Sequence, residues 1–223
     1  TGDYLVIALG AEMAPDTIPG LNEVGHTFYT LEGAQRLNEV RSMFRRGRMV
    51  ILVCSMPFKC PAAPLEAALL LEGDCRKRHI RESVDINLYT PEPGPMPLAG
   101  PENSHQLRTI VEARGIGYHS EHVVTRVDSD SKHIHFSNGV TADFDLLVYI
   151  PPHRAPEVVR NAGLVGESGW IQVDKYTMAT RFPRIYAIGD VTGIKLPVGK
   201  PMPKAGVIAH GQAEVVVNNL VFE

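Results

Sequence analysis

A short apolar run that leads into a carboxylate is the first feature of this 223-residue chain that could support chemistry. Residues 185–188 (IYAI) are followed directly by Gly189 and Asp190. Glycine lets the backbone approach a ligand closely, and ligands of parallel α/β sheets bind at the carboxyl ends of strands. A carboxylate there can accept hydrogen bonds from sugar or polyol hydroxyls. Because Gly-Asp pairs are also common in turns, this pattern needs support from other residues.

A cysteine stands where a buried strand is predicted to give way to a helix. Cys60 follows the apolar run MVILVC and precedes Pro61, a residue suited to the first turn of a helix. The helix N-terminus and the neighbouring Lys59 would both favour a thiolate, which can attack sulfur or form a redox disulfide. The alternative is a small buried hydrophobic residue. Glu66 is a candidate proton acceptor for this thiol, or a residue that caps or pairs on the helix.

The other cysteines and the histidines do not form a metal-binding pattern. Cys54 ends a predicted strand and Cys75 lies within a predicted helix, so we expect both to pack in the core. Three cysteines are an odd number, which argues against a closed disulfide framework. We expect no metal, since four histidines cluster without metal-like spacing and are predicted to lie on surface strands. They are His119, His122, His133 and His135.

Alternating strands and helices must position these residues. Apolar runs predict buried strands at residues 4–9, 49–54, 83–89 and 146–150. Helical spacing predicts helices at residues 31–46, 65–80, 102–114 and 204–222. Short strands are expected at 123–128, 133–136 and 185–188, and loops at 11–30 and in the proline-rich segment 91–101. The strand, helix, strand order implies a parallel sheet with right-handed crossovers.

The segment from Trp170 to Asp190 resembles the second FAD fingerprint of FAD-dependent pyridine nucleotide-disulfide oxidoreductases. The matching residues are Val173-Asp174, Thr180 and the run PRIYAIGD at 183–190. This resemblance implies that Asp190, next to Gly189, contacts the ribityl chain of FAD.

Two further segments look like the same superfamily. The opening YLVIALGA is similar to its Ala-Thr-Gly strand motif, which would place Gly10 near the FAD pyrophosphate; Leu9 replaces the usual threonine. PMPKAG at 201–206 resembles a Pro-Lys-x-Gly segment at a helix N-terminus, which favours the negative charge of reduced flavin. Cofactor binding is therefore implied for a second group of residues, with an ordinary capped helix as the alternative. They are Lys204, Ala205, Gly206 and Val207.

The Cys60 segment resembles a narrower group in this superfamily. Lys-Cys-Pro-x-x-Pro-x-Glu after a buried strand looks like sulfide:quinone oxidoreductases and the flavoprotein subunit of flavocytochrome c sulfide dehydrogenase. In those enzymes this cysteine is one of a pair beside the flavin that oxidises sulfide, and its partner lies beyond the last helix of this chain. The glycines of a nucleotide-binding loop would fall on Lys59, Pro61 and Pro64. Prolines lack amide donors, so we expect no pyridine nucleotide to bind.

The resemblance implies an α/β fold in which a Rossmann-like parallel sheet domain, the second dinucleotide-type domain, is inserted in part of an FAD-binding domain. We expect residues 1–25 and 165–223 to belong to the FAD-binding domain and residues 26–164 to the insertion. The first Gly-x-Gly-x-x-Gly fingerprint is not in this sequence. We therefore expect a fragment that is inactive by itself.

The implied function is oxidation of sulfide or another small sulfur compound through Cys60 and FAD, with electrons passed to a quinone or a cytochrome. The alternatives are an NAD(P)H-dependent flavin disulfide reductase or NADH dehydrogenase, and a folded, redox-inert binding module. A net charge of −3 without a basic tract argues against nucleic acid. No apolar run is long enough for a membrane span. Peripheral membrane association and a homodimer of the full-length protein stay open, as does the compartment, cytoplasm or membrane surface.

Overall fold

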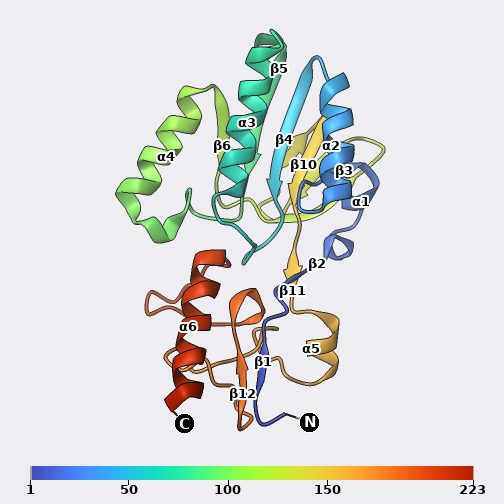
Figure 1. Cartoon of the computed structure of the whole chain (residues 1–223). Helices are drawn as coiled ribbons and strands as arrows, with labels where there is room; N and C mark the ends of the chain where they lie inside the picture. The colour runs from blue at the N-terminus through green and yellow to red at the C-terminus, as the bar shows by residue number, and fades with distance from the viewer. Residues whose placement is uncertain (1, 223) are drawn as a thin grey trace. The chain divides into compact units, whose positions relative to one another are not determined.

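The computed structural model describes residues 2–222, which fold into two compact units (Figure 1). Unit 1 comprises Thr1–Ala14, Pro57–Pro61 and His153–Glu223, and unit 2 comprises Pro15–Met56 and Ala62–Pro152. Unit 2 thus interrupts unit 1 in the sequence. The chain passes between units at 14/15 and 152/153, whereas the boundaries expected from the sequence were 25/26 and 164/165. No sequence pattern indicated that residues 57–61 return to unit 1.

A five-stranded parallel sheet forms the centre of unit 2 and confirms the predicted α/β fold class. Its strand order is β3-β10-β4-β5-β6, and every neighbouring pair is parallel. The strands are β3 Gly25–His26, β4 Gly47–Val53, β5 Val84–Tyr89, β6 Ile116–His119 and β10 Leu146–Ile150. β3 and β6 were not predicted, because the two residues of β3 and the mixed run IGYH of β6 carry no clear strand pattern.

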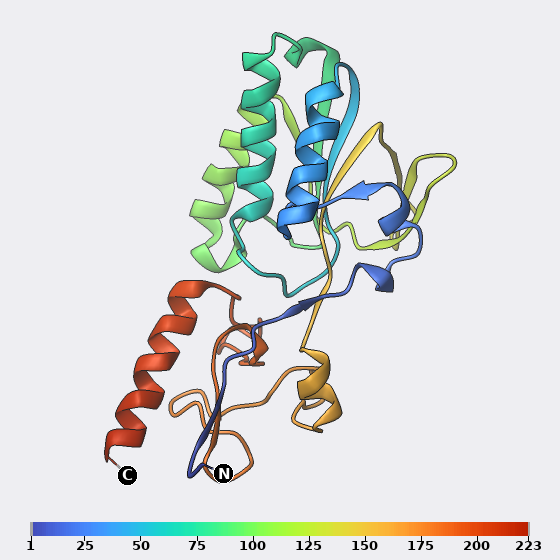
Figure 2. The same ribbon diagram turned by 45° about the vertical axis from the view of Figure 1, so that its right-hand side comes forward.

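Different layers cover the two faces of this sheet. Three helices lie along one face (Figures 1 and 2): α2 Leu31–Met43, α3 Ala63–Lys77 and α4 Pro101–Ala113. A three-stranded antiparallel sheet shares a core with the sheet: β7 Val124–Asp128, β8 His133–Phe136 and β9 Thr141–Asp143. Val50 and Leu52 of β4 pack in this core with Ile134 of β8. Burial on both faces explains why β4 is a continuous apolar run.

The predicted loop over residues 11–30 is wrong, because this segment contains four short elements. They are β2 Glu12–Met13, the 3₁₀ helix η1 Pro15–Thr17, α1 Leu21–Val24 and β3. Each is too short to show a periodic pattern. Gly20 takes the left-handed conformation (φ 77°) that starts α1, so the glycine that suggested a loop in fact marks a boundary between elements.

Unit 1 consists of short strands, short helices and the longer helix α6 around two small apolar clusters. β1 Leu5–Ile7 pairs in parallel with β12 Ile185–Ala187, and β2 pairs antiparallel with β11 His153–Arg154. The helices are α5 Glu157–Asn161, the 3₁₀ helix η4 Gly189–Val191 and α6 Gly206–Phe222. Trp170 packs in the cluster that contains Ile7 and Val191. Two more 3₁₀ turns belong to unit 2, η2 Arg81–Ser83 and η3 Pro97–Ala99.

The strand predicted at residues 4–9 is correct in its parallel pairing and wrong in its burial. Leu5 and Leu9 are 51% and 57% exposed, and Ile7 is the buried residue of this run. Within residues 2–222, β1 hydrogen-bonds to β12 alone. A two-stranded sheet buries one part of its surface and leaves the remaining side chains in water.

The four long predicted helices are present, with small differences at their ends. No helix in the described part of the chain is both long and apolar enough for a membrane span.

Candidate functional site

The turn after β12 is fixed by hydrogen bonds from both sides. Gly189 has φ 73°, a conformation that favours glycine, and a Cβ there would lie 3.4 Å from the Cβ of Ala209. The Gly189 amide donates to Oε1 of Gln212 at 2.6 Å, and the Gly189 carbonyl accepts from Oγ1 of Thr192 at 2.8 Å. Gln212 is buried on α6. The helix therefore holds the backbone of the turn in place.

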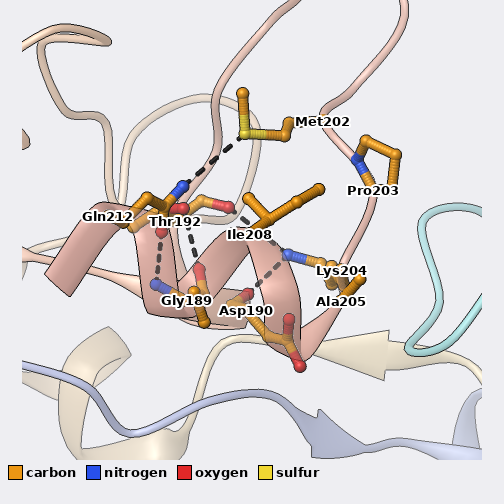
Figure 3. Close-up of a pocket in the computed structure, with 10 residues that line it drawn as sticks. Gly189, Asp190, Thr192, Met202, Pro203, Lys204, Ala205, Ile208 and Gln212 are labelled. Atoms are coloured by element: carbon orange, nitrogen blue, oxygen red, sulfur yellow. Dashed lines mark hydrogen bonds between the residues drawn. The ribbon is translucent and has the colours of Figure 1, made fainter. Parts of the chain in front are cut away.

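The carboxylate of Asp190 points away from the hydrogen bonds of Gly189. The residue is partly exposed, and its carboxylate has no hydrogen bond to any of the described residues. Figure 3 shows the carboxylate projecting away from Gln212 and Thr192. It is thus free to accept hydrogen bonds from the hydroxyls of a ligand.

Lys204 is a buried cation that hydrogen-bonds to the backbone of this turn. Its side chain is 4% exposed, and Nζ donates to the carbonyl oxygens of Asp190 and, at 3.3 Å, of Thr192. The same nitrogen lies 3.3 Å from the ring centroid of Trp170. Burial lowers the pKa of Lys204 to about 8, while the Asp190 carboxylate acts to raise this pKa. The ammonium is thus bound within the protein.

A small hollow lies between the Gly189 turn and the start of α6, entirely within unit 1 (Figure 3). Its lining residues are Gly189, Asp190, Thr192, Met202, Pro203, Lys204, Ala205, Ile208, Ala209 and Gln212. Four of these were candidates from the sequence, namely Gly189, Asp190, Lys204 and Ala205. Two other candidates begin α6, next to Ala205: Gly206, and Val207, which is largely exposed.

Gly10 follows β1, the strand that pairs with the strand before this turn. The register of the two parallel strands pairs Ile7 with Ala187, and the Ile188 amide donates to the Ile7 carbonyl at 2.9 Å. Gly10 and Asp190 therefore both follow the carboxyl ends of neighbouring strands, where parallel sheets bind ligands. Gly10 has φ 68°, and the space around a Cβ there is open.

The loop that carries Cys60 belongs to unit 1 and pairs with the Lys204 segment. The Cys60 amide donates to the Lys204 carbonyl at 2.8 Å, and Lys59 forms a parallel β-bridge with Lys204. Cys60 is exposed and takes φ 57°, a left-handed conformation that is uncommon outside glycine. The structure thus joins two segments that were separate candidates in the sequence.

The sequence predicts Cys60 at the N-terminus of a helix with Pro61 in the first turn, but the structure places both residues before that helix. α3 begins at Ala63, with Ala62 as its N-cap and Pro64 in its first turn. A proline disfavours the helical conformation of the residue before it, so Pro61 keeps Cys60 out of the helix. Glu66 is exposed in the first turn of α3, in unit 2, while Cys60 belongs to unit 1. Its role as proton acceptor stays a prediction.

The two remaining cysteines are core residues, as predicted. Cys54 and Cys75 are 2% and 1% exposed, and burial raises the pKa of both thiols. All three cysteines are free thiols.

The prediction that the four histidines are surface strand residues is wrong for His119 and His122, which pack against aromatic rings, whereas His133 and His135 do lie on the strand β8. His119 stacks on Tyr89 with ring centroids 4.2 Å apart, and its Nε2 lies 2.9 Å from Oδ1 of Asn87. His122 makes edge contacts with Tyr89 and Phe136. Burial, followed by the charge of His122, lowers the pKa of His119. Within residues 2–222, no cluster of three or more His, Cys, Asp or Glu side chains could hold a metal ion.

Three residues of the site were missed in the sequence: Trp170, Thr192 and Gln212. The signal for Gln212 was a polar side chain in the apolar helical run VIAHGQAEVVV, and Trp170 is the single tryptophan of the chain. Neither signal indicates which residues these side chains contact, because the contacting residues come together only when α6 and η4 pack.

Comparison with known proteins shows the family of this chain. Residues 65–213 match the model of the pyridine nucleotide-disulphide oxidoreductase family. The chain belongs to this family. The family and its sulfide:quinone oxidoreductase members are flavoproteins that bind FAD.

Three comparisons describe the likeness. The mitochondrial sulfide:quinone oxidoreductase of Dictyostelium discoideum is 25% identical over 98% of this chain and 49% of its own length. The alternative NAD(P)H-ubiquinone oxidoreductase C1 of Arabidopsis thaliana is 25% identical over 95% of this chain and 44% of its own length. The crystal structure of sulfide:quinone oxidoreductase from Aquifex aeolicus gives a TM-score of 0.82 at 24% identity, over 98% of this chain and 54% of that one. This chain therefore spans about half the length of these relatives.

Proposed function

We propose that this chain is part of an FAD-dependent oxidoreductase that oxidises sulfide, or another small sulfur compound, through Cys60 and passes the electrons to a quinone or a cytochrome. One observation carries the proposal: the hydrogen bond from the Cys60 amide to the Lys204 carbonyl. This bond joins the backbone of Cys60, an exposed residue, to the segment that resembles the flavin-binding Pro-Lys-x-Gly motif, which supports a role for its thiol.

The residues of the hollow fit the ribityl and flavin end of FAD. Asp190 offers a carboxylate without a hydrogen-bond partner in residues 2–222, which suits polyol hydroxyls. α6 begins at Gly206, around which the space for a Cβ is open, and its first amides suit an anionic group. FAD bound by these residues would supply a two-electron acceptor for the sulfur compound.

The setting of Cys60 supports this role. Its side chain is exposed in a loop, so a small sulfur compound can reach it, whereas the two core cysteines are shielded. The left-handed backbone is of the kind that persists at functional sites when surrounding contacts hold it. The β-bridge of Lys59 with Lys204 provides such contacts.

Residues in the loop between β4 and α3 argue against a pyridine nucleotide as the reductant. Of the three positions where glycines would be needed, Lys59 and Pro61 belong to unit 1, and Pro64 lies in the first turn of α3. Without glycines and with two prolines, this loop offers fewer amide donors to a pyrophosphate.

A second candidate is an NAD(P)H-dependent flavin oxidoreductase of the same family. The Arabidopsis relative, which is named as an NAD(P)H-ubiquinone oxidoreductase, is as similar in identity as the Dictyostelium sulfide:quinone oxidoreductase. The two candidates differ in the compound that reduces the flavin.

An anaerobic absorbance experiment on the longer protein that contains this chain separates the candidates. We expect sulfide to bleach the flavin band at roughly 450 nm and NADH to leave the band unchanged. Cys60→Ser should abolish the sulfide response, while Cys75→Ala, which removes a buried thiol in α3, should keep it. Normal bleaching of Cys60→Ser by sulfide would refute the proposal. Bleaching by NADH would favour the second candidate, and a protein without a flavin band would favour a redox-inert binding module.

A further inference from the structure

We infer that Lys204 is a positioning residue that fastens the Cys60 loop to the Gly189–Asp190 turn. The importance of this positioning for catalysis rests on the proposed function, but the positioning itself can be tested without flavin or sulfide. It differs from the sequence-based expectation, in which Lys204 was a direct ligand of the cofactor.

The inference comes from the two ends of one residue. At its backbone, the Lys204 carbonyl accepts from the Cys60 amide at 2.8 Å, and the β-bridge to Lys59 extends this contact. At its side chain, Nζ donates to the carbonyls of Asp190 and Thr192. One residue therefore connects two segments of unit 1 that are far apart in the sequence, and each segment carries a candidate functional group.

The burial of the cation supports a role that an apolar residue could not perform. Transferring an ammonium group from water into the protein is costly unless it is paired. The compensation here comes from the two carbonyls and the face of the Trp170 indole ring. A methionine could fill the same space without that cost, but it would donate no hydrogen bond to the turn.

The strength of the hydrogen bonds from the Lys204 side chain to the turn should depend on pH. Burial lowers the pKa of Lys204 to about 8, so the ammonium is present at neutral pH and is lost as the pH rises further. Of the charged groups in the described chain, the Asp190 carboxylate acts on this pKa, and the other contacts are neutral carbonyls and the Trp170 ring. Between about pH 8 and the ordinary lysine pKa of 10.5, an opened chain binds a proton at Lys204 that the folded chain does not bind. Opening of the turn and the Cys60 loop should therefore become more costly as the pH rises above about 8.

Amide hydrogen exchange of the 223-residue chain measures this coupling directly. The readout is the protection factor of the Cys60 amide between about pH 6.5 and 9.5, corrected for intrinsic exchange. In the wild type we expect protection to rise as the pH rises through the pKa of Lys204, because the opened chain binds more protons than the folded chain in that range. In Lys204→Met we expect protection about tenfold lower at neutral pH and a flat pH profile, because the loss of a buried hydrogen bond is of that order.

Lys195→Met is the matched control, since Lys195 is exposed in the same part of unit 1. It should reproduce the wild-type protection and pH profile. A Lys204→Met profile equal to that of the wild type would overturn the inference, and so would wild-type protection that does not change with pH. The wild-type profile decides the matter even if Lys204→Met fails to fold. No readout involves sulfide or flavin. Failure of this inference therefore leaves the proposed function unaffected, and failure of the proposed function leaves this inference unaffected.

Discussion

Replacing Gln212 with leucine should destabilise unit 1 selectively. Gln212 is 7% exposed on α6, and its Oε1 accepts the amide hydrogen of Gly189 at 2.6 Å. Leucine has a similar size and a good helix propensity, so the change removes the hydrogen bond with little effect on the helix itself. The amide of Gly189 would then lose its acceptor at the start of η4.

The expected loss follows from the setting of that amide. A buried donor left without a partner costs about 1–3 kcal/mol. Gly189 is partly exposed, so water can compensate in part, and we expect a loss near the lower end, about 1.5 kcal/mol. For a chain of this size, that loss corresponds to a decrease in Tm of about 3–6 °C.

Trp170 makes the measurement specific for unit 1. It is the single tryptophan of the chain and packs in a core cluster of unit 1, so its fluorescence during urea unfolding reports on that unit. Gln172→Leu is the matched control. Gln172 also makes a side-chain hydrogen bond of 2.6 Å, to Ser168, but it is exposed, so its loss should cost less than about 0.5 kcal/mol.

Equal unfolding free energies for the two glutamine variants would refute the reasoning. Such a result would mean that burial of the Gln212 bond adds nothing to its energetic value. A large loss of unfolding free energy for Gln172→Leu would also contradict the reasoning, which assigns the stabilising hydrogen bond to Gln212 on α6.

Three other predictions use different parts of the chain. Gly189→Ala should destabilise unit 1 by about 1–2 kcal/mol in the same fluorescence assay, because φ 73° is strained for alanine and its Cβ would lie tight against Ala209; an unchanged midpoint would contradict this. A thiol reagent should modify one cysteine, Cys60, in the native chain and three after denaturation, which mass spectrometry can count; rapid native modification of the two core thiols would show that their burial is wrong. The free energy of unfolding should fall as the pH drops below 6.5, because burial lowers the pKa of His26 and His119 and the unfolded chain then binds more protons than the folded one. Urea unfolding midpoints measured by circular dichroism between pH 7.5 and 5 test this prediction. A midpoint that rises with acidity would contradict it.

Elements with a strong local pattern were predictable from the sequence. β4 is buried on both faces and so forms an uninterrupted apolar run, and α3 and α4 have the apolar spacing of helices packed on a sheet. β2, β3 and α5 were not predictable, because strands of two residues show no alternation and the five residues of α5 are little more than one helical turn. Their conformation depends on the partners that they meet after folding.

The sequence by itself determined the family resemblance and most candidate residues of the site, because a short motif such as PRIYAIGD specifies a strand, a turn and a carboxylate locally. The tertiary structure alone decided how these candidates meet. It returned the loop of Cys60 to unit 1, paired that loop with Lys204 and turned the Lys204 ammonium toward the carbonyls of Asp190 and Thr192. The physical reason is that hydrogen bonds between distant segments, and the burial of a charge, depend on packing that no local pattern encodes.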